Sequence, residues 1–162
     1  MLKQSIYLSC KTMKNLMWIP FIALLFSCEK VQDSELLIDS VVEIELLEAV
    51  AAGTGEITLR CKTLKEYICY NYVIGYDKAG EGNALKINFQ HIALGATQQC
   101  ATAIGPATAE IALGKLEDGL YFLELNNGKL VNKGILEVSA TEFILNFPQQ
   151  TGIDILTPVV LR

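Results

Sequence analysis

Residues 119–138 read GLYFLELNNGKLVNKGILEV and carry the clearest structural signal in the chain. Two runs rich in apolar residues flank Asn126-Asn127-Gly128, and an Asn-Gly pair readily adopts the positive φ angles of a type I′ turn. The stretch therefore predicts a β-hairpin with strands near 119–126 and 129–138. Strands that bury one face only belong to antiparallel sheets, so we expect an antiparallel sheet.

The same two-residue period recurs from about residue 39 onward. It is visible in four sets of apolar positions: Val42, Ile44 and Leu46; Ile57, Leu59 and Cys61; Leu85, Ile87 and Phe89; Phe143, Leu145 and Phe147. Glycine-rich turn signals separate the runs, at 53–55, 77–82 and 118–119.

These signals predict about nine strands, near residues 40–50, 55–62, 66–76, 83–94, 107–113, 119–126, 129–138, 141–147 and 152–161. Residues 36–52 could also form a helical stripe, but the alternation from Val42 to Leu46 favours a strand. Short strands with turns at this spacing predict an all-β domain over residues 39–162, folded as an antiparallel β-sandwich.

Composition limits the classes of function. The chain has 162 residues, with 13 Lys and Arg, 18 Asp and Glu, and one His. Loss of the first 27 residues would remove Lys3, Lys11 and Lys14 and leave a formal net charge of −8. This balance disfavours nucleic acid and electrostatic docking on anionic lipid headgroups. One histidine excludes a multi-histidine metal site, and we expect no metal or cofactor.

The N-terminus has the layout of an export signal. Residues 13–28 read MKNLMWIPFIALLFSC, in which Lys14 precedes an apolar run of 11 residues that ends before Ser27 and Cys28. A helix needs about 20 apolar residues to span a bilayer, so we expect a cleaved signal peptide over residues 1–27. Residues 1–12 add nothing to this pattern; translation from Met13 and a long n-region are the two alternatives.

The sequence Leu25-Phe26-Ser27-Cys28 resembles the lipobox of bacterial lipoproteins, although Phe26 stands where a small residue is commonest. The resemblance implies that Cys28 is lipidated and that residues 28–38 are its tether, because several acyl chains together give a stable membrane anchor. The acidic residues after Cys28 resemble the surface-export signals of Bacteroidota lipoproteins. We therefore expect an outer-membrane lipoprotein of the cell envelope, on its periplasmic face or at the cell surface.

Three cysteines remain after Cys10 and Cys28 are set aside: Cys61, Cys69 and Cys100. An exported chain meets an oxidising compartment, so we expect one disulfide and one spare thiol. Cys61 shares a predicted apolar face with Leu59, which favours a buried thiol. Three pairings are possible, and a Cys69–Cys100 bond is preferred because it would close a long loop and remove entropy from the unfolded chain. A Cys61–Cys69 bond across a hairpin is the alternative.

Three further motifs resemble small β-sandwich lipoproteins of Bacteroidota, over about residues 40–147. They are Cys69-Tyr-Asn71-Tyr72, Cys100 with Gly105-Pro106-Ala107, and LGKLEDGLYFLEL at 113–125. The last resembles a hairpin of immunoglobulin-like modules, in which Gly119 would open the turn and Tyr121 would pack inside. The resemblance implies an immunoglobulin-like architecture and membrane attachment, and it implies no reaction.

No catalytic residue is predicted, and we expect the chain not to be an enzyme. His91 follows Phe89 on the alternating apolar face, which favours a place at the edge of the core; the spacing gives no support to a Cys–His pair with Cys61 or Cys100. Six carboxylates at turns and polar faces are expected to be solvated: Glu43, Glu45, Glu56, Asp77, Glu81 and Asp118. Phosphate-loop, nucleophile-elbow and Cys-x-x-Cys motifs are absent from the sequence.

Binding-surface candidates lie in two segments. Tyr67 and Tyr72 would fall on opposite faces of the predicted strand 66–76, so one ring would be exposed to a protein or a sugar, although core packing is favoured. The long uncharged loop Gly95–Pro106 contains Gln98 and Gln99 and is the first candidate among the loops.

We therefore predict a lipid-anchored binding or structural module whose partner, beside the membrane, is an envelope protein or a glycan. An immunoglobulin-like protease inhibitor that presents this loop is the alternative. A small hydrolase with a carboxylate pair is a further alternative.

Overall fold

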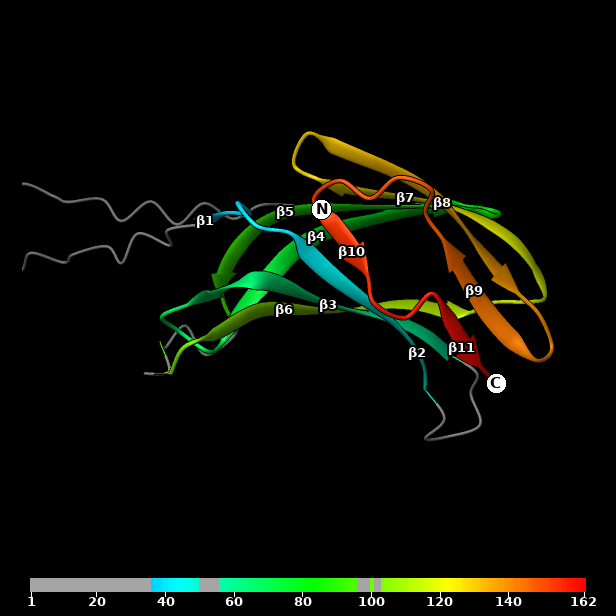
Figure 1. Cartoon of the computed structure of the whole chain (residues 1–162), viewed down its shortest axis with the longest axis horizontal. Helices are drawn as coiled ribbons and strands as arrows, with labels where there is room; N and C mark the ends of the chain where they lie inside the picture. Colours follow the sequence, from blue (N-terminus) through cyan, green and yellow to red (C-terminus); the bar gives the residue numbers. More distant parts are fainter. Residues whose placement is uncertain (1–35, 50–55, 96–99, 101–102) are drawn as a thin grey trace, which may run out of the picture. The chain divides into compact units, whose positions relative to one another are not determined.

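All of the regular structure described by the computed structural model is β, and the described residues are 36–49, 56–95, 100 and 103–162 (Figure 1). The strands are β1 (Leu36–Leu37), β2 (Val42–Ala49), β3 (Glu56–Tyr67), β4 (Tyr72–Glu81), β5 (Ala84–Leu94), β6 (Gly105–Lys115), β7 (Gly119–Asn127), β8 (Leu130–Val138), β9 (Glu142–Asn146), β10 (Ile153–Ile155) and β11 (Val159–Leu161). The prediction of an all-β domain is confirmed. The predicted signal and lipidation site lie outside the described residues.

The strands form a mixed sheet in the order β10-β2-β3-β6-β4-β5-β7-β8-β9-β11, with β1 paired to β5. Three pairings among the described strands are parallel: β10 with β2, β4 with β6, and β5 with β7. The expectation of an antiparallel sheet is wrong at these places. A two-residue period reports which face of a strand is buried, and it holds no information about the direction of the neighbouring strand.

The join between β4 and β6 is short. The two strands meet at the pair Val73 and Thr108. Side chains of β4 then reach the backbone of β6: Tyr76 Oη donates to the carbonyl of Glu110 (3.4 Å), and Lys78 Nζ donates to that of Ala112 (2.6 Å). The strand order thus has two extensively paired halves, and Figure 1 shows the sheet curling between them.

Residues 152–162 join the two ends of the strand order. β10 pairs with β2 and β11 pairs with β9. Between them, Leu156 N donates to the carbonyl of Ile44 (2.9 Å) and Leu145 N donates to the carbonyl of Pro158 (2.7 Å). The single strand predicted over 152–161 is wrong, because Pro158 has no N–H for a continuous ladder and the chain crosses there from one edge to the other.

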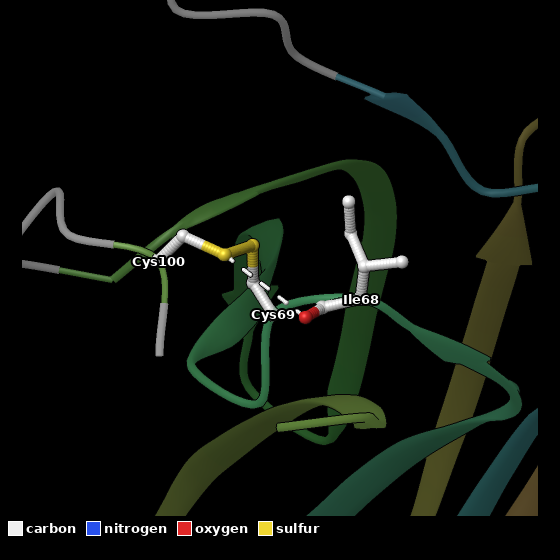
Figure 2. Close-up of a disulfide and its surroundings, with 3 residues drawn as sticks. All are labelled: Ile68, Cys69 and Cys100. Atoms are coloured by element: carbon white, nitrogen blue, oxygen red, sulfur yellow. Dashed lines mark hydrogen bonds between the residues drawn. A yellow bond between two sulfur atoms is a disulfide. The ribbon is translucent and has the colours of Figure 1, made fainter. Parts of the chain in front are cut away.

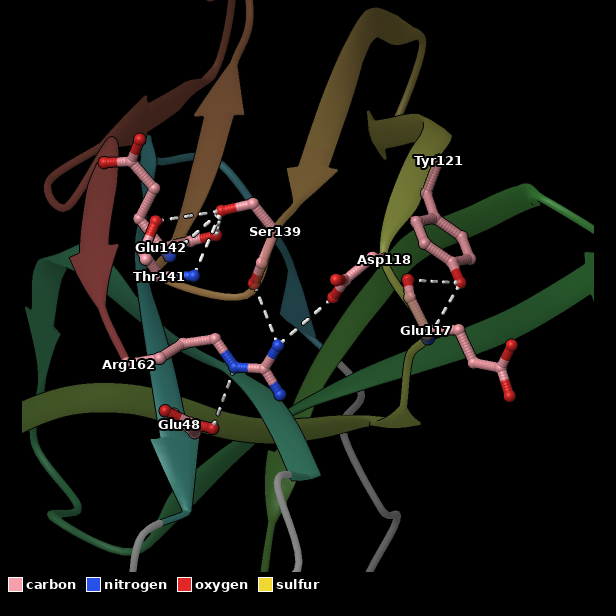
Figure 3. A network of polar contacts seen from close by, with 8 residues as sticks. All are labelled: Glu48, Glu117, Asp118, Tyr121, Ser139, Thr141, Glu142 and Arg162. Carbon is pink, nitrogen blue, oxygen red and sulfur yellow. Dashed lines mark hydrogen bonds and ion pairs between the residues drawn. The ribbon is translucent and has the colours of Figure 1, made fainter.

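Arg162 ties this segment to three parts of the sheet (Figure 3). Its guanidinium forms ion pairs with Glu48 of β2 (3.6 Å) and with Asp118, which precedes β7 (3.3 Å). Nη1 also donates to the carbonyl of Ser139 after β8 (2.8 Å), and the group lies 4.9 Å from the centroid of the Phe143 ring. One side chain therefore fastens the closure through charge-assisted hydrogen bonds and a cation–π contact.

Inward-facing side chains from both halves fill one core. The buried residues include Ile44, Leu46, Leu59, Ile111, Ile87, Leu125, Leu136 and Phe143. The alternations predicted over 42–46, 57–61 and 143–147 are confirmed, and β2 is a strand rather than a helix. Burial of this apolar surface is the main favourable contribution to folding.

The hairpin predicted at 119–138 forms, but its turn is shifted. The turn residues are Gly128 and Lys129, with Gly128 at φ +60°, and Asn127 pairs with Leu130. Asn126 and Asn127 therefore end β7 and are buried. The turn predicted across 77–82 is shifted in the same way, because β4 continues to Glu81.

Buried asparagines donate hydrogen bonds to backbone carbonyls around the connection from β9 to β10. Asn127 Nδ2 donates to the carbonyls of Ser40 (2.9 Å) and Gly152 (2.8 Å). Asn132 Nδ2 donates to the carbonyls of Leu125 (3.2 Å) and Thr151 (3.0 Å), and its Oδ1 accepts from Thr151 N (2.7 Å). These amides tie the connection from β9 to β10 to Ser40 and to β7, and an apolar side chain at either position would lose those hydrogen bonds.

His91 does not lie on the core face. The ladder between β4 and β5 shifts register between Gly75 and Tyr76, whose partners are His91 and Phe89. Because the shift adds one residue to β5, the next inward position after Phe89 is Ile92. His91 is half-buried on the opposite face, so its predicted place on the alternating apolar face is wrong.

Candidate functional site

The tyrosine candidates lie together rather than on opposite faces. β3 ends at Tyr67 and β4 begins at Tyr72, so the predicted single strand over 66–76 is wrong. The intervening turn brings the two rings into edge-to-face contact, with centroids 5.7 Å apart. Tyr67 is 8% exposed and Tyr72 is half-buried. Tyr70, between them, is the exposed tyrosine of this group.

Tyr67 belongs to a polar cluster with the segment that follows β1. Lys65 Nζ forms an ion pair with Asp39 Oδ2 at 2.6 Å, and Tyr67 Oη donates to Asp39 Oδ1 at 3.4 Å. The hydrogen bond from Lys65 lowers the pKa of Asp39, and burial raises the pKa of Tyr67. These contacts attach residues 39–40 to β3, which is a structural role for Tyr67.

The structure places Cys69 and Cys100 at disulfide distance, which agrees with the preferred pairing (Figure 2). Their Cα atoms are 5.0 Å apart, with 31 residues of sequence separation. Cys100 Sγ also lies 4.0 Å from the carbonyl oxygen of Ile68; a disulfide sulfur has no proton to donate, so this is a non-bonded contact. Cys61 is the buried free thiol, and burial raises its pKa to about 12.

Gln98 and Gln99 lie outside the described residues, as does most of the loop Gly95–Pro106. The proposal that this loop is a binding surface stays a prediction.

The carboxylate candidates are spread over the sheet. Glu43 pairs with Lys62 (3.2 Å) and Glu45 with Arg60 (3.9 Å), as cross-strand ion pairs between β2 and β3. Asp118 pairs with Arg162, Asp77 accepts from Gln90 Nε2, and Glu56 and Glu81 are exposed. Within the described residues, no group of three or more His, Cys, Asp or Glu side chains is arranged to hold a metal ion.

A groove of about 560 Å³ crosses the outer face of β4, β5, β7 and β8. Its lining includes Ala79 and Glu81 of β4, Ala84, Leu85 and Lys86 of β5, Phe122, Leu123 and Glu124 of β7, and Lys133 of β8. The register explains this gathering, since Ala84 is opposite Phe122, Lys86 is opposite Glu124, and Glu124 is opposite Lys133. Neighbouring strands therefore place an apolar row beside a charged row.

Glu124 is the centre of the charged row. Lys86 Nζ lies 2.7 Å from Glu124 Oε1 and Lys133 Nζ lies 4.0 Å from Oε2. Asn126 Nδ2 donates to Glu124 Oε1 and to Asn88 Oδ1, each at 2.9 Å. The hydrogen bond from Lys86, followed by that from Asn126, lowers the pKa of Glu124. The carboxylate is ionised and held in one position between two cations.

Phe122 is the large side chain of the apolar row, and it is 60% exposed. Phe122 was not among the site residues predicted from the sequence. Its signal was present, because Tyr121, Leu123 and Leu125 occupy the inward positions and Phe122 therefore falls on the face where polar residues are expected. Phe122 is opposite the exposed Ile135 of β8, and a contiguous exposed apolar patch often marks a binding surface.

No protein-family model, curated protein or solved structure matches the chain, so no function is transferred from a relative. Nor does the part of the chain that the structure describes include a helix able to span a bilayer.

Proposed function

We propose that this chain is a lipid-anchored module of the cell envelope that binds a neutral glycan in the groove of β4, β5, β7 and β8. The attachment rests on the export signal and lipobox of residues 13–28, and on the tether that leads to Leu36. Its place would be the outer membrane, on either face, and its role would be binding without turnover. The pairing of Cys69 with Cys100 supports export to an oxidising compartment.

The domain is proposed to be a β-sandwich of the immunoglobulin-like class. In support, β10-β2-β3-β6 and β4-β5-β7-β8-β9-β11 are each continuous and supply inward side chains to one core. Their direct join is the short one between β4 and β6. Two such halves packed face to face would make the layers of a sandwich.

A glycan is proposed as the ligand because the exposed ring of Phe122 lies beside the row formed by Lys86, Glu124 and Lys133. An aromatic ring offers a flat apolar face to the C–H groups of a sugar, while fixed ammonium and carboxylate groups donate to and accept from its hydroxyls. Glu81 and Glu124 balance Lys86 and Lys133 in the lining, so the groove suits an uncharged polar ligand better than a strongly charged one. The groove volume lies within the usual range for small-molecule sites.

A panel of immobilised neutral oligosaccharides, followed by calorimetry with those retained, tests this proposal. Phe122→Ala should weaken binding by about tenfold, which corresponds to about 1.4 kcal/mol. Leu120→Ala is the matched control, because Leu120 lies on the same face of β7, is 50% exposed and does not line the groove. Its affinity should change less than twofold.

Two outcomes would contradict the proposal. Retention of no oligosaccharide, or equal losses in the two variants, would remove the groove as a glycan site. Hydrolysis of a retained glycan that disappears in Glu124→Gln would show that the chain is an enzyme.

A further inference from the structure

The end of the domain that carries the disulfide is apolar and exposed. Ile68, Tyr70 and Ile104 are 77%, 64% and 69% exposed, and they flank Cys69 and Gly105 in the sequence. We call Ile68, Tyr70, Ile104 and the Cys69–Cys100 bond the disulfide tip. Three large apolar side chains this exposed and this close in the fold are unusual for a surface that meets only water.

The tip is also free of charge. Residues 67–76 and the described residues 92–95, 100 and 103–109 contain no Asp, Glu, Lys or Arg. The nearest charged residues along the chain are Glu66, Asp77 and Glu110. A surface without ionic groups can leave water without the cost of stripping solvent from a charge.

The tip is held in a fixed shape. The disulfide joins the segment after β3 to the segment before β6 (Figure 2). The ring of Tyr70 lies against Gly105, where a Cβ would come within 2.7 Å of Tyr70 Cδ2. Tyr70 therefore packs against the residue that follows Ile104, beside the cross-link.

The direction of β1 indicates that the chain from the proposed lipidation site enters the domain near the disulfide tip. β1 is antiparallel to β5, with Leu36 opposite Ile92 and Leu37 opposite His91. β5 runs toward the tip and ends at Leu94, opposite Tyr72. β1 therefore runs away from the tip, and its first residue is the one nearer to it. Eight residue steps separate Cys28 from Leu36, a span of at most about 28 Å.

We propose that the disulfide tip contacts the bilayer to which Cys28 is anchored, with Ile68, Tyr70 and Ile104 seated at the boundary of headgroups and acyl chains. This inference rests on the proposed lipidation. The apolar side chains gain from burial, and the Tyr70 hydroxyl stays at the wet level where tyrosine is enriched in membrane proteins. The acidic remainder of the domain is repelled by anionic lipids, so the contact favours zwitterionic headgroups.

This orientation leaves the groove free. Lys86 lines the groove and Leu94 ends the same strand at the tip, eight residues further along β5. At about 3.3 Å per residue, the two sites are roughly 26 Å apart along the strand. A domain standing on its disulfide tip therefore holds the groove away from the lipid surface.

Fluorescence depth measurements on the lipidated chain test the contact. Trp18 is the single tryptophan and lies in the predicted signal, so Tyr70→Trp would supply the one reporter of the mature protein. In vesicles of phosphatidylethanolamine and phosphatidylcholine, we expect a blue-shifted emission and quenching by lipids brominated on the acyl chains. Phe122→Trp, at the groove, is the matched control and should be quenched at least threefold less.

A second pair of variants covers the case in which Tyr70→Trp folds poorly. Ile68→Ser with Ile104→Ser should reduce the co-sedimentation of a non-acylated Cys28→Ser chain with these vesicles by at least threefold. Leu120→Ser, an exposed change on β7, should leave it unaltered.

The outcomes separate this inference from the proposed function. If the intact mass shows acylated Cys28 while Tyr70→Trp and Phe122→Trp are quenched equally, the tip does not contact lipid and the inference alone fails. A blue shift of Tyr70→Trp that requires an added envelope protein would make the tip a protein-docking surface and would also overturn it. If the mass shows an unacylated chain, the anchor of the proposed function fails.

Discussion

The imidazole ring of His91 lies across the backbone of Gly75, its partner in the ladder between β4 and β5. A Cβ built on residue 75 would come within 2.5 Å of His91 Nε2 and 2.6 Å of Cε1. The two residues adjoin the register shift that returns Ile92 to the core. Glycine at position 75 thus makes room for the histidine that the bulge turns outward.

Gly75→Ala should destabilise the domain by about 1–3 kcal/mol, because the new methyl group and the His91 ring would occupy the same space. Urea unfolding measures the loss. In a His91→Ala background the same substitution should cost much less, since its steric partner is gone. Equal costs in the two backgrounds would show that the ring contact is not the cause.

Asn132→Ala should cost about 1–3 kcal/mol, because it removes the partners of the Leu125 and Thr151 carbonyls and of Thr151 N. Asn146→Ala, an exposed asparagine on β9, should change stability by less than about 0.5 kcal/mol. Chemical denaturation of both variants makes the comparison. A loss for Asn132→Ala no greater than for Asn146→Ala would contradict the bridging role.

Removal of the Cys69–Cys100 bond by paired substitution with serine should destabilise the domain by about 3–4 kcal/mol in the loop-entropy model. Alkylation followed by mass measurement supplies a second check. Without reductant, the mature domain should take up label at Cys61 only, and only after unfolding, because that thiol is buried and its pKa is about 12. Rapid labelling of Cys69 in the native, unreduced domain would refute the pairing.

The contribution of Glu124 should depend on pH. Its folded pKa lies below the ordinary value, so its ionisation stabilises the fold above the unfolded pKa of about 4.3 and this contribution disappears as pH falls through the folded pKa. The difference in urea midpoint between the unmodified chain and Glu124→Gln should thus be full at pH 7 and shrink below about pH 4.3. Glu137→Gln, on the outer face of β8, is the control. A difference that stays constant down to pH 2 would exclude this linkage.

The alternation of apolar residues was sufficient to predict the all-β fold and the buried faces over 42–46, 57–61 and 143–147. Val42, Ile44 and Leu46 face inward as the period requires. Strand direction was not predictable, because β5 and β7 become parallel neighbours through a connection that runs by way of β6. The exact turn positions were also missed, since Asn126 and Asn127 are turn formers in isolation but are buried and hydrogen-bonded at the end of β7 here.

The residues that line the groove could not be grouped from the sequence, for a related reason. Glu124 and Lys133 share one hairpin, but Lys86 is distant from both in the chain and meets them only through the parallel pairing of β5 with β7. Phe122 alone gave a local sign, as an aromatic residue out of phase with its strand. The surface chemistry of this sheet depends on cross-strand neighbours, which a single sequence does not specify.

The strands that close the sheet, β10 and β11, are the last to be synthesised. Val42 pairs with Ile153, so one edge of the fold is completed by a residue synthesised 111 positions later. Until the ribosome has passed Leu161, the edges of β2 and β9 lack their covering strands. Folding is therefore late and dominated by distant contacts, which slows it. Such a delay would suit the export proposed above, in which the polypeptide crosses a membrane before it acquires its final shape.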